Sequence, residues 1–285
     1  MYRLSREVRF AIDLTTPEDR AVGGRNGYAG KPPITGIGQI YYALVVTVRG
    51  EPSVGDGYIV NIKDVDGAVR ERALPEIKRV VRRMCRAGFD GKAEPVGGLH
   101  LLRDVFSKLA DAFSPHVLDT IELKLSPHTR LIAMERPGNT PMTYLKHTFE
   151  FAASHRLHNP AKTDEENVAI FGKCNNPHGH GHNYQFEVTL RGEPDEDGFL
   201  INFYDLERIV DEAVVEPLDH KHLNIEVAEF QDGNPDRLNP SVEFIAKVIY
   251  RRLQKALGGE HAELDAVTVW ETPKTWCEYR EPAGV

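Results

Sequence analysis

The stretch EVTLRGEPDEDGFLINFYDLE, residues 187–207, occurs twice in the chain in similar form. Its counterpart is VVTVRGEPSVGDGYIVNIKDVD, residues 45–66, about 142 positions earlier. Two further matches keep nearly the same offset: LDTIELKLSPHT with LDAVTVWETPKT, and RFAIDL with EFAASH. Collinear matches at a constant offset indicate an internal repeat. We therefore predict two tandem domains, 1–137 and 142–285, on either side of the Pro- and Gly-rich linker ERPGNTP.

The second half carries strand and helix patterns in a clear order. Residues 144–157 and 182–191 alternate apolar and polar side chains, as half-buried strands do. Residues 203–216 change to helical spacing, and a second helix is expected from NPSVEF onward, with Asn239 as N-cap and Pro240 in the first turn. AVTVWE and TWCEYR predict a closing hairpin. This order predicts an α+β domain, a four-stranded antiparallel sheet with two helices on one face.

The composition argues against several classes of protein. The 285 residues are 41% hydrophobic and 27% charged, as in soluble globular proteins. A net charge of −8 disfavours a nucleic-acid partner, whose phosphates require a basic surface. We expect no membrane association, because no uncharged apolar run reaches the roughly 18 residues that span a bilayer and MYRLSREVRFAIDL does not resemble a signal peptide. Three scattered cysteines do not suggest a disulfide framework, so we expect a cytoplasmic protein.

Histidines gather in FGKCNNPHGHGHNYQFEVTL, residues 171–190. His180 and His182 stand at the head of a predicted strand and project from the same face, because side chains alternate along a strand. His155, at the end of the preceding strand, can supply a third imidazole. Three imidazoles without a fourth protein ligand are typical of a zinc site with an open, catalytic position. A solvated histidine-rich loop is the alternative interpretation of the same spacing.

Other polar residues near these strands have more than one interpretation. Cys174 could be a fourth metal ligand, a core residue, or a nucleophile or base. Asp219 and His220 could form a proton relay or simply a polar helix end. Glu271 lies in an apolar strand, where a carboxylate needs hydrogen-bond donors from the protein or from a ligand.

The motifs FAASHRL, GKCNNPHGHGHNY, PLDHKHLN, NPSVEFIA and WETP, in this order across residues 144–281, resemble the 6-pyruvoyltetrahydropterin synthase family. That family includes the 6-carboxytetrahydropterin synthases of queuosine biosynthesis. The resemblance implies a tunnelling fold (T-fold), whose four-stranded sheets join between subunits into a barrel. It also implies a lyase that uses Zn2+ and eliminates triphosphate from 7,8-dihydroneopterin triphosphate. Phe244 departs from the pattern, since the family often has asparagine there.

The resemblance also implies roles for individual residues. It makes His155, His180 and His182 the zinc ligands, Cys174 the catalytic thiol, Asp219 and His220 its proton-transfer partners, and Glu271 the carboxylate that binds the amino-amide edge of the pterin. The queuosine branch places its metal pair nearer the cysteine, and this chain has a further histidine there, His178. The strand alignment favours His180 and His182. Arg156, Lys173 and Lys221 are candidate contacts for the triphosphate.

Three functions therefore remain open at this point. The pyruvoyl and carboxy enzymes share the substrate, the metal and most of these residues. A metal- or pterin-binding module without turnover is the interpretation from another class. A binding module would not need the thiol, the Asp–His pair and the carboxylate together, so we favour a lyase. Between the two enzymes, the pyruvoyl type is our first choice and the carboxy type is the alternative.

The first half lacks the corresponding chemistry. In the repeat alignment His155 corresponds to Leu14, Glu271 to Leu125 and Cys174 approximately to Lys31, while the histidine pair falls on Ile37 and Gln39, or on Gly38 and Ile40. We expect a degenerate T-fold domain without a metal site, kept for assembly or regulation. A separate site with its own ligand is the alternative. A chain with two T-folds leads us to expect a homotrimer, with a dimer or tetramer as the second choice.

Overall fold

The computed structural model of the chain describes residues 1–14, 38–89, 97–138, 140–258 and 261–282. It divides into two compact units. Unit 1 comprises Met1–Lys146 with Gly192–Leu200, and unit 2 comprises His147–Arg191 with Ile201–Val285. Each unit combines a sheet with helices, so the predicted α+β class is confirmed.

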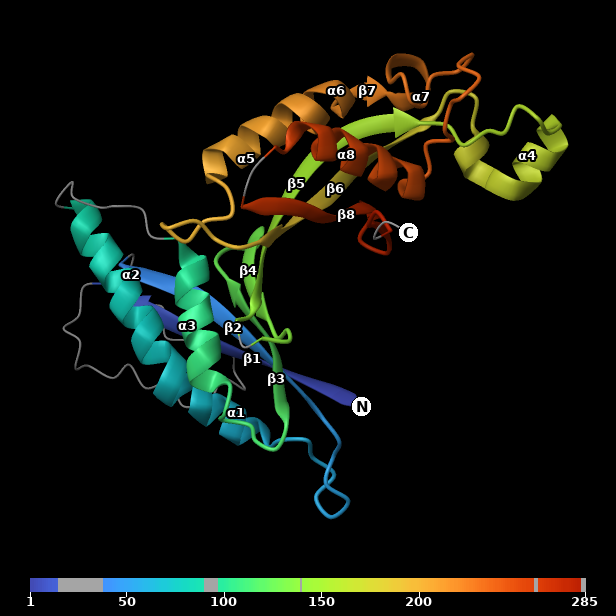
Figure 1. Ribbon diagram of the computed structural model, residues 1–285. Helices are drawn as coiled ribbons and strands as arrows, with labels where there is room; N and C mark the ends of the chain where they lie inside the picture. The colour runs from blue at the N-terminus through green and yellow to red at the C-terminus, as the bar shows by residue number, and fades with distance from the viewer. Residues whose placement is uncertain (15–37, 90–96, 139, 259–260, 283–285) are drawn as a thin grey trace. The chain divides into compact units, whose positions relative to one another are not determined.

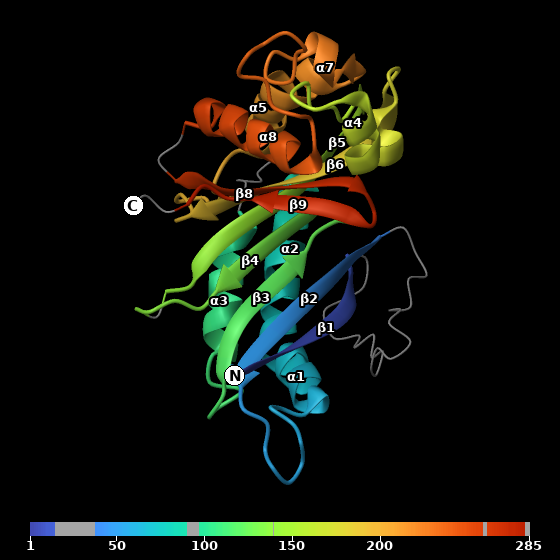
Figure 2. The same cartoon turned by 90° about the vertical axis from the view of Figure 1, so that its right-hand side faces the viewer.

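Unit 1 is a sheet with helices on one face (Figure 1). Its strands lie in the order β1-β2-β3-β4, and each runs antiparallel to its neighbour. Figure 2 shows these strands side by side in front of α2 and α3. The elements are β1 (Tyr2–Asp13), β2 (Gln39–Gly50), α1 (Ile62–Ala68), a π-helical turn (Val69–Ala73), α2 (Leu74–Phe89), α3 (Gly98–Leu109), β3 (Val117–Lys124) and β4 (Thr129–Met134).

Unit 2 is built on strands in the order β5-β6-β8-β9, with α5 and α8 on one face (Figure 1). A short strand, β7 (Lys221–His222), adds to β5 in parallel. The strands are β5 (Met142–His155), β6 (His180–Gly192), β8 (Ala262–Thr272) and β9 (Thr275–Tyr279). The helices are α4 (Asp164–Phe171), a 3-10 turn (Gly172–Asn175), α5 (Phe203–Val210), a π-helical turn (Asp211–Val215), α6 (Glu216–Leu218), α7 (Leu223–Glu226) and α8 (Val242–Ala256).

The strands and helices predicted for the second half are confirmed within a few residues, but the start of α8 was predicted wrongly. Its N-cap is Ser241, not Asn239. The Asn239 side chain instead accepts a hydrogen bond from the amide of His158, 3.2 Å away, and this contact occupies the oxygen that a cap would use. The unpredicted helix is α4, which begins with a capping box formed by Thr163 and Glu166.

Corresponding positions in the two units make the same helix-starting contact. The Asn61 side chain accepts a hydrogen bond from the Lys63 amide (3.0 Å) at the start of α1. The Asn202 side chain accepts one from the Tyr204 amide (2.9 Å) at the start of α5. Each helix then passes through a π-helical turn, Val69–Ala73 or Asp211–Val215.

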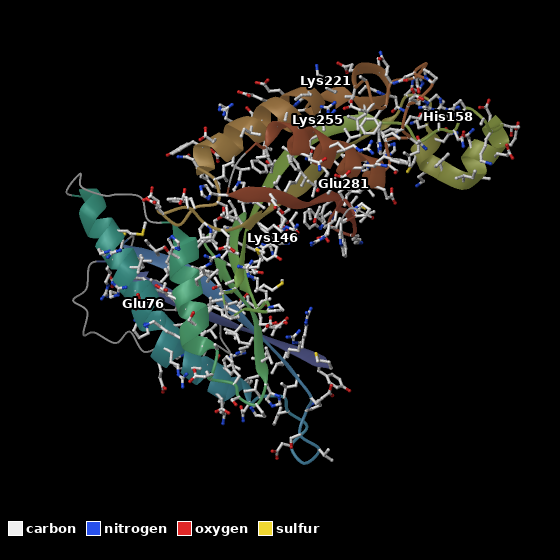
Figure 3. The ribbon with its side chains drawn as sticks, in the orientation of Figure 1. Glu76, Lys146, His158, Lys221, Lys255 and Glu281 are labelled. Carbon is white, nitrogen blue, oxygen red and sulfur yellow. The ribbon has the colours of Figure 1, made fainter. Side chains whose placement is uncertain are left out.

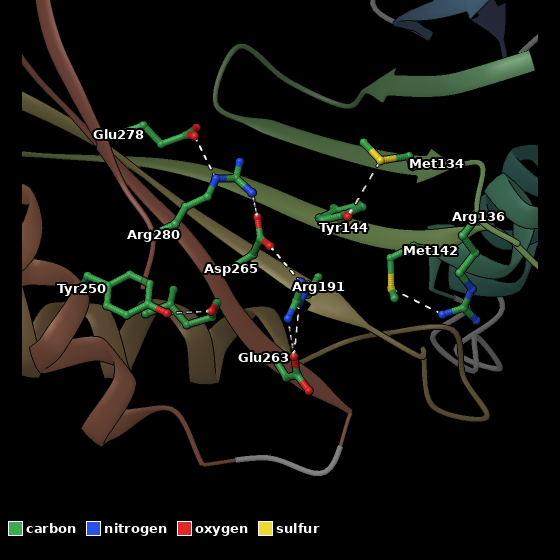
Figure 4. Close-up of polar contacts among 11 residues, drawn as sticks. Met134, Arg136, Met142, Tyr144, Arg191, Tyr250, Glu263, Asp265, Glu278 and Arg280 are labelled. Atoms are coloured by element: carbon green, nitrogen blue, oxygen red, sulfur yellow. Dashed lines mark hydrogen bonds and ion pairs between the residues drawn. The ribbon is translucent and has the colours of Figure 1, made fainter. Parts of the chain in front are cut away.

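Both units also contain an aspartate with a largely buried side chain that pairs with an arginine of the neighbouring strand. In unit 1 Arg49 on β2 lies 3.6 Å from Asp119 on β3. In unit 2 Arg191 on β6 lies 3.4 Å from Asp265 on β8, and Arg280 contacts the same carboxylate at 2.6 Å (Figure 4). These pairs stand at matching places in the repeat alignment.

The segment Gly192–Leu200 begins at the last residue of β6 but packs within unit 1. His100 on α3 hydrogen-bonds the carbonyl of Asp195 (2.8 Å), and Glu193 forms ion pairs with Arg103 and Arg136. The helix also approaches through Gly97, where a Cβ would overlap the carbonyl of Gly198. Glycine at position 97 is therefore required by the close approach of two backbones.

None of the helices formed by the described residues combines the length and apolar character needed to cross a membrane.

Candidate active site

Three histidines from two neighbouring strands converge at one end of the unit 2 sheet. His155 is the last residue of β5, and His180 and His182 begin β6 on a single face. The Nε2 atoms of His155 and His180 are 3.1 Å apart, and the ring centroids of the three lie 4.5 to 5.3 Å from one another. One ligand atom from each lies within 4.8 Å of the others. The predicted trio therefore meets in space.

His155 is fixed by the start of α8. Its side chain is fully buried, and its Nδ1 is 2.6 Å from the carbonyl oxygen of Pro240. A carbonyl only accepts, so Nδ1 carries the proton and Nε2 presents its lone pair to the other histidines. Burial lowers the pKa of His155 to about 4, which keeps the ring neutral near neutral pH.

These residues fit a bound metal ion. The His182 Nε2 is buried and has no hydrogen-bond partner among the described residues, although buried polar atoms normally have one. Neutral imidazole nitrogens are ligands that Zn2+ prefers, and three of them leave a fourth position open. Burial also lowers the pKa of His180, which favours the neutral form that binds metal. In the described part of the chain no other group of His, Cys, Asp or Glu side chains meets this geometry.

The turn between residues 176 and 180 depends on a glycine. Gly179 has φ +73°, a backbone conformation that favours glycine. A Cβ there would lie 2.9 Å from Nε2 of His222 and 3.0 Å from the His155 carbonyl oxygen. His178 is exposed and stands outside the converging trio, and its amide donates to Asn176.

Glu271 lies beside the histidines. Its Oε1 is 3.4 Å from Nε2 of His155 and 3.6 Å from Nε2 of His182, and its side chain is 20% exposed. The pairing register of β8 with β9 shifts between Trp270 and Thr272. Such an irregularity re-aims a side chain, and this one occurs at Glu271.

Cys174 reaches the same end of β5 through its backbone. It lies in the 3-10 turn after α4, and its carbonyl accepts a hydrogen bond from the amide of Leu157, 2.9 Å away. Its thiol is free and partly exposed. The charges of Glu271 and then Cys174 add to burial in raising the pKa of Tyr184, so these groups share one neighbourhood.

Asp219 and His220 form a hydrogen-bonded pair against β5. Asp219 accepts from the amide of Ala152 (2.8 Å), and its other oxygen is 2.6 Å from Nδ1 of His220. The Ala152 amide, followed by the His220 imidazole, lowers the pKa of Asp219, which therefore stays ionised near neutral pH. The His220 side chain is 83% exposed, and its φ of +55° is unusual for a residue other than glycine.

A cavity of about 590 Å³ is lined by His220 of this pair and by His182 of the trio. His182, His220 and His222 all line it, together with Lys221, which is labelled in Figure 3. Lys221 lies 3.5 Å from Glu226. Arg156, another candidate for the triphosphate, donates from Nε to the carbonyl (3.1 Å) and side chain (3.2 Å) of Asn175.

Two residues of this region were missed by the sequence reasoning. His222 packs against Gly179, and its Nδ1 is buried without a partner among the described residues. Tyr184 is fully buried, with its hydroxyl 3.4 Å from Nε2 of His155. The alternation that placed His180 and His182 on one face also places Tyr184 there, so this residue could have been found.

The first half lacks these groups where the structure describes it. Leu14 follows β1 and Leu125 follows β3, in the positions aligned with His155 and Glu271. Gly38, Gln39 and Ile40 stand at the start of β2. Lys31 and Ile37 lie outside the described residues.

Comparison with known proteins gives consistent matches for the second half. The family model described as 6-pyruvoyl tetrahydropterin synthase matches residues 144–282. The human 6-pyruvoyl tetrahydrobiopterin synthase is 39% identical over 150 residues, which cover 52% of this chain and 99% of that protein. A 6-carboxy-5,6,7,8-tetrahydropterin synthase from Haemophilus influenzae is 30% identical over 128 residues, covering 39% of this chain and 86% of that protein.

Among solved structures, the 6-pyruvoyl tetrahydropterin synthase of Caenorhabditis elegans is 32% identical and covers 50% of this chain and 97% of its own, with a TM-score of 0.46. The predicted family is confirmed by the family match and by the nearly complete coverage of the human enzyme. Through its C-terminal half, the chain belongs to the 6-pyruvoyl tetrahydropterin synthase family of lyases.

Proposed function

We propose that the chain is a zinc-dependent lyase that acts on 7,8-dihydroneopterin triphosphate and eliminates triphosphate, as a 6-pyruvoyltetrahydropterin synthase. The observation that supports this most is the convergence of His155, His180 and His182 beside Glu271. His182 of this trio and His220 line one cavity. A binding module would not require the hydrogen-bonded Asp219–His220 pair, of which His220 lines the cavity.

Each residue has a task in this proposal. His155, His180 and His182 would hold the ion, which when bound supplies Lewis-acid polarisation of the substrate side-chain hydroxyls. Glu271 binds the amino-amide edge of the pterin, a planar pair of N–H donors suited to a carboxylate. Asp219 orients the His220 imidazole, which moves protons from its free nitrogen. Cys174 exchanges protons at the substrate carbons as a thiol and thiolate, and loss of triphosphate completes the elimination.

The second candidate is a 6-carboxytetrahydropterin synthase of queuosine biosynthesis. It is favoured by the similarity to the Haemophilus influenzae enzyme and by His178, which stands nearer the cysteine than the converging pair. His178 is exposed and lies outside the converging trio, which supports the pyruvoyl type. In either case we place the reaction in the cytoplasm, because three free thiols suit a reducing compartment.

We further propose that the first half is a second T-fold domain without a metal site. The shared helix starts at Asn61 and Asn202, and the shared arginine–aspartate pairs, support a common origin by duplication. The role proposed for this domain is assembly.

The metal ligands can be tested by substitution. His182→Ala should lose most of its zinc, because it removes the buried nitrogen that lacks another partner. His178→Ala, two positions away and exposed, should keep one zinc per chain. Elemental analysis of both purified variants measures this directly. Zinc lost from His178→Ala and kept by His182→Ala would overturn the ligand assignment.

The reaction can be tested by incubating the zinc-loaded protein with 7,8-dihydroneopterin triphosphate and identifying the products by mass. We expect triphosphate and a pterin with a pyruvoyl side chain, and a carboxy product would favour the second candidate.

Cys174→Ala should keep zinc and pterin binding but lose about 10²-fold or more in turnover, because a positioned acid–base group is removed. Cys277→Ala, which changes a thiol on β9, is the matched control and should retain activity. Equal turnover in the Cys174 and Cys277 variants would contradict the role of Cys174.

The edge strands β1 and β9 indicate how several copies of the chain could assemble. β1 is the edge strand of unit 1 and β9 that of unit 2, and Tyr2 and Trp276 on these strands are each 59% exposed. Exposed strand edges invite pairing, and barrel closure between subunits removes them. We expect a homotrimer, with one sheet of each chain in each of two rings and zinc only in the C-terminal domains. Light scattering should give three times 32.0 kDa, about 96 kDa. A mass of two or four chains would contradict the trimer.

A further inference from the structure

Tyr184 is a buried phenol inside the candidate active site, and the reaction outlined above does not use it. It stands on β6 two residues beyond His182 and is fully buried. Its ring stacks on Phe151, with centroids 5.0 Å apart. The same ring lies 6.1 Å from the ring of His155 and 5.5 Å from that of His182. The aromatic packing fixes the ring, and the hydroxyl is thereby directed at the histidines.

The hydroxyl of Tyr184 and a metal ion would compete for the same atom. Its hydrogen-bond partner among the described residues is Nε2 of His155, at 3.4 Å. That nitrogen carries a single lone pair, because Nδ1 donates to Pro240. It also faces Nε2 of His180 at 3.1 Å. Once a metal occupies the lone pair, the buried hydroxyl has to donate elsewhere, since a buried donor without a partner is unfavourable.

Glu271 provides an acceptor beside the same His155 nitrogen. Its Oε1 lies 3.4 Å from the same His155 nitrogen. It is also only 3.6 Å from Nε2 of His182, so the carboxylate could itself become a fourth metal ligand unless another donor holds it. A phenol hydroxyl is protonated near neutral pH, so Tyr184 is a hydrogen-bond donor there.

We propose that Tyr184 is a positioning residue: when the metal is bound, its hydroxyl donates to the Glu271 carboxylate and holds that carboxylate off the metal and toward the pterin. This inference rests on the proposed function, in which Glu271 binds the pterin. The phenol thereby keeps the fourth metal position open for substrate oxygen. The hydroxyl changes its acceptor from Nε2 of His155 to the Glu271 carboxylate, and the hydroxyl oxygen and Oε1 of Glu271 each lie 3.4 Å from that nitrogen.

The test uses Co2+ in place of zinc, because the visible absorption of Co2+ reports its ligands. In Tyr184→Phe, Glu271 should join the metal and change the visible spectrum, and adding Glu271→Gln should restore it. The affinity for unphosphorylated 7,8-dihydroneopterin should fall about tenfold in Tyr184→Phe, the effect of losing a hydrogen bond to a charged group. Tyr250→Phe is the matched control. Its hydroxyl donates to the Leu264 carbonyl (3.2 Å; Figure 4 shows Tyr250), and neither measurement should change.

A second measurement does not depend on the folding of Tyr184→Phe. Glu271→Gln, in a chain that retains Tyr184, should leave the Co2+ spectrum unchanged, because the carboxylate is not a ligand there. A changed spectrum in that variant would overturn the proposal. So would a Tyr184→Phe protein with both the spectrum and the pterin affinity of the unsubstituted protein. The spectra require neither pterin nor turnover, so they decide the role of Tyr184 even if the proposed reaction proves wrong.

Discussion

The hydrogen bond between Nδ1 of His155 and the carbonyl of Pro240 determines the chemistry of this site. It joins the end of β5 to the start of α8 and selects one tautomer of a buried imidazole. The lone pair of Nε2 then faces His180, Glu271 and Tyr184. With the other tautomer, Nε2 would carry a proton and could not bind a metal. The same bond holds Pro240 at β5, directly before Ser241, the N-cap of α8.

The patterns that repeat along the sequence predicted most of unit 2. Alternation located β5 and β6, and the same alternation placed His180 and His182 on one face. The position of Glu271 on β8 followed from a short apolar run. These predictions succeed because side chains alternate strictly between the two faces of a strand, and the buried face is made of apolar residues.

What could not be predicted depends on contacts between distant segments. Asparagine is a common N-cap residue, yet the Asn239 side chain accepts a hydrogen bond from the amide of His158, 81 residues away in the sequence. Alternation places Tyr184 on the same face as His180 and His182, but the contact of its hydroxyl with His155 depends on the approach of β5 and could not be read from the sequence. The attachment of Gly192–Leu200 to unit 1 rests on pairs such as Glu193 with Arg103. By contrast, α4 was predictable from its capping box and was overlooked.

The central claim is that three imidazoles bind one metal and leave a position open. X-ray absorption of the zinc-loaded protein without substrate tests it most directly. We predict three imidazole nitrogens at about 2.0–2.1 Å and one further light atom from water. A sulfur atom at about 2.3 Å would make Cys174 a ligand, and would contradict both the open position and the catalytic role of the thiol.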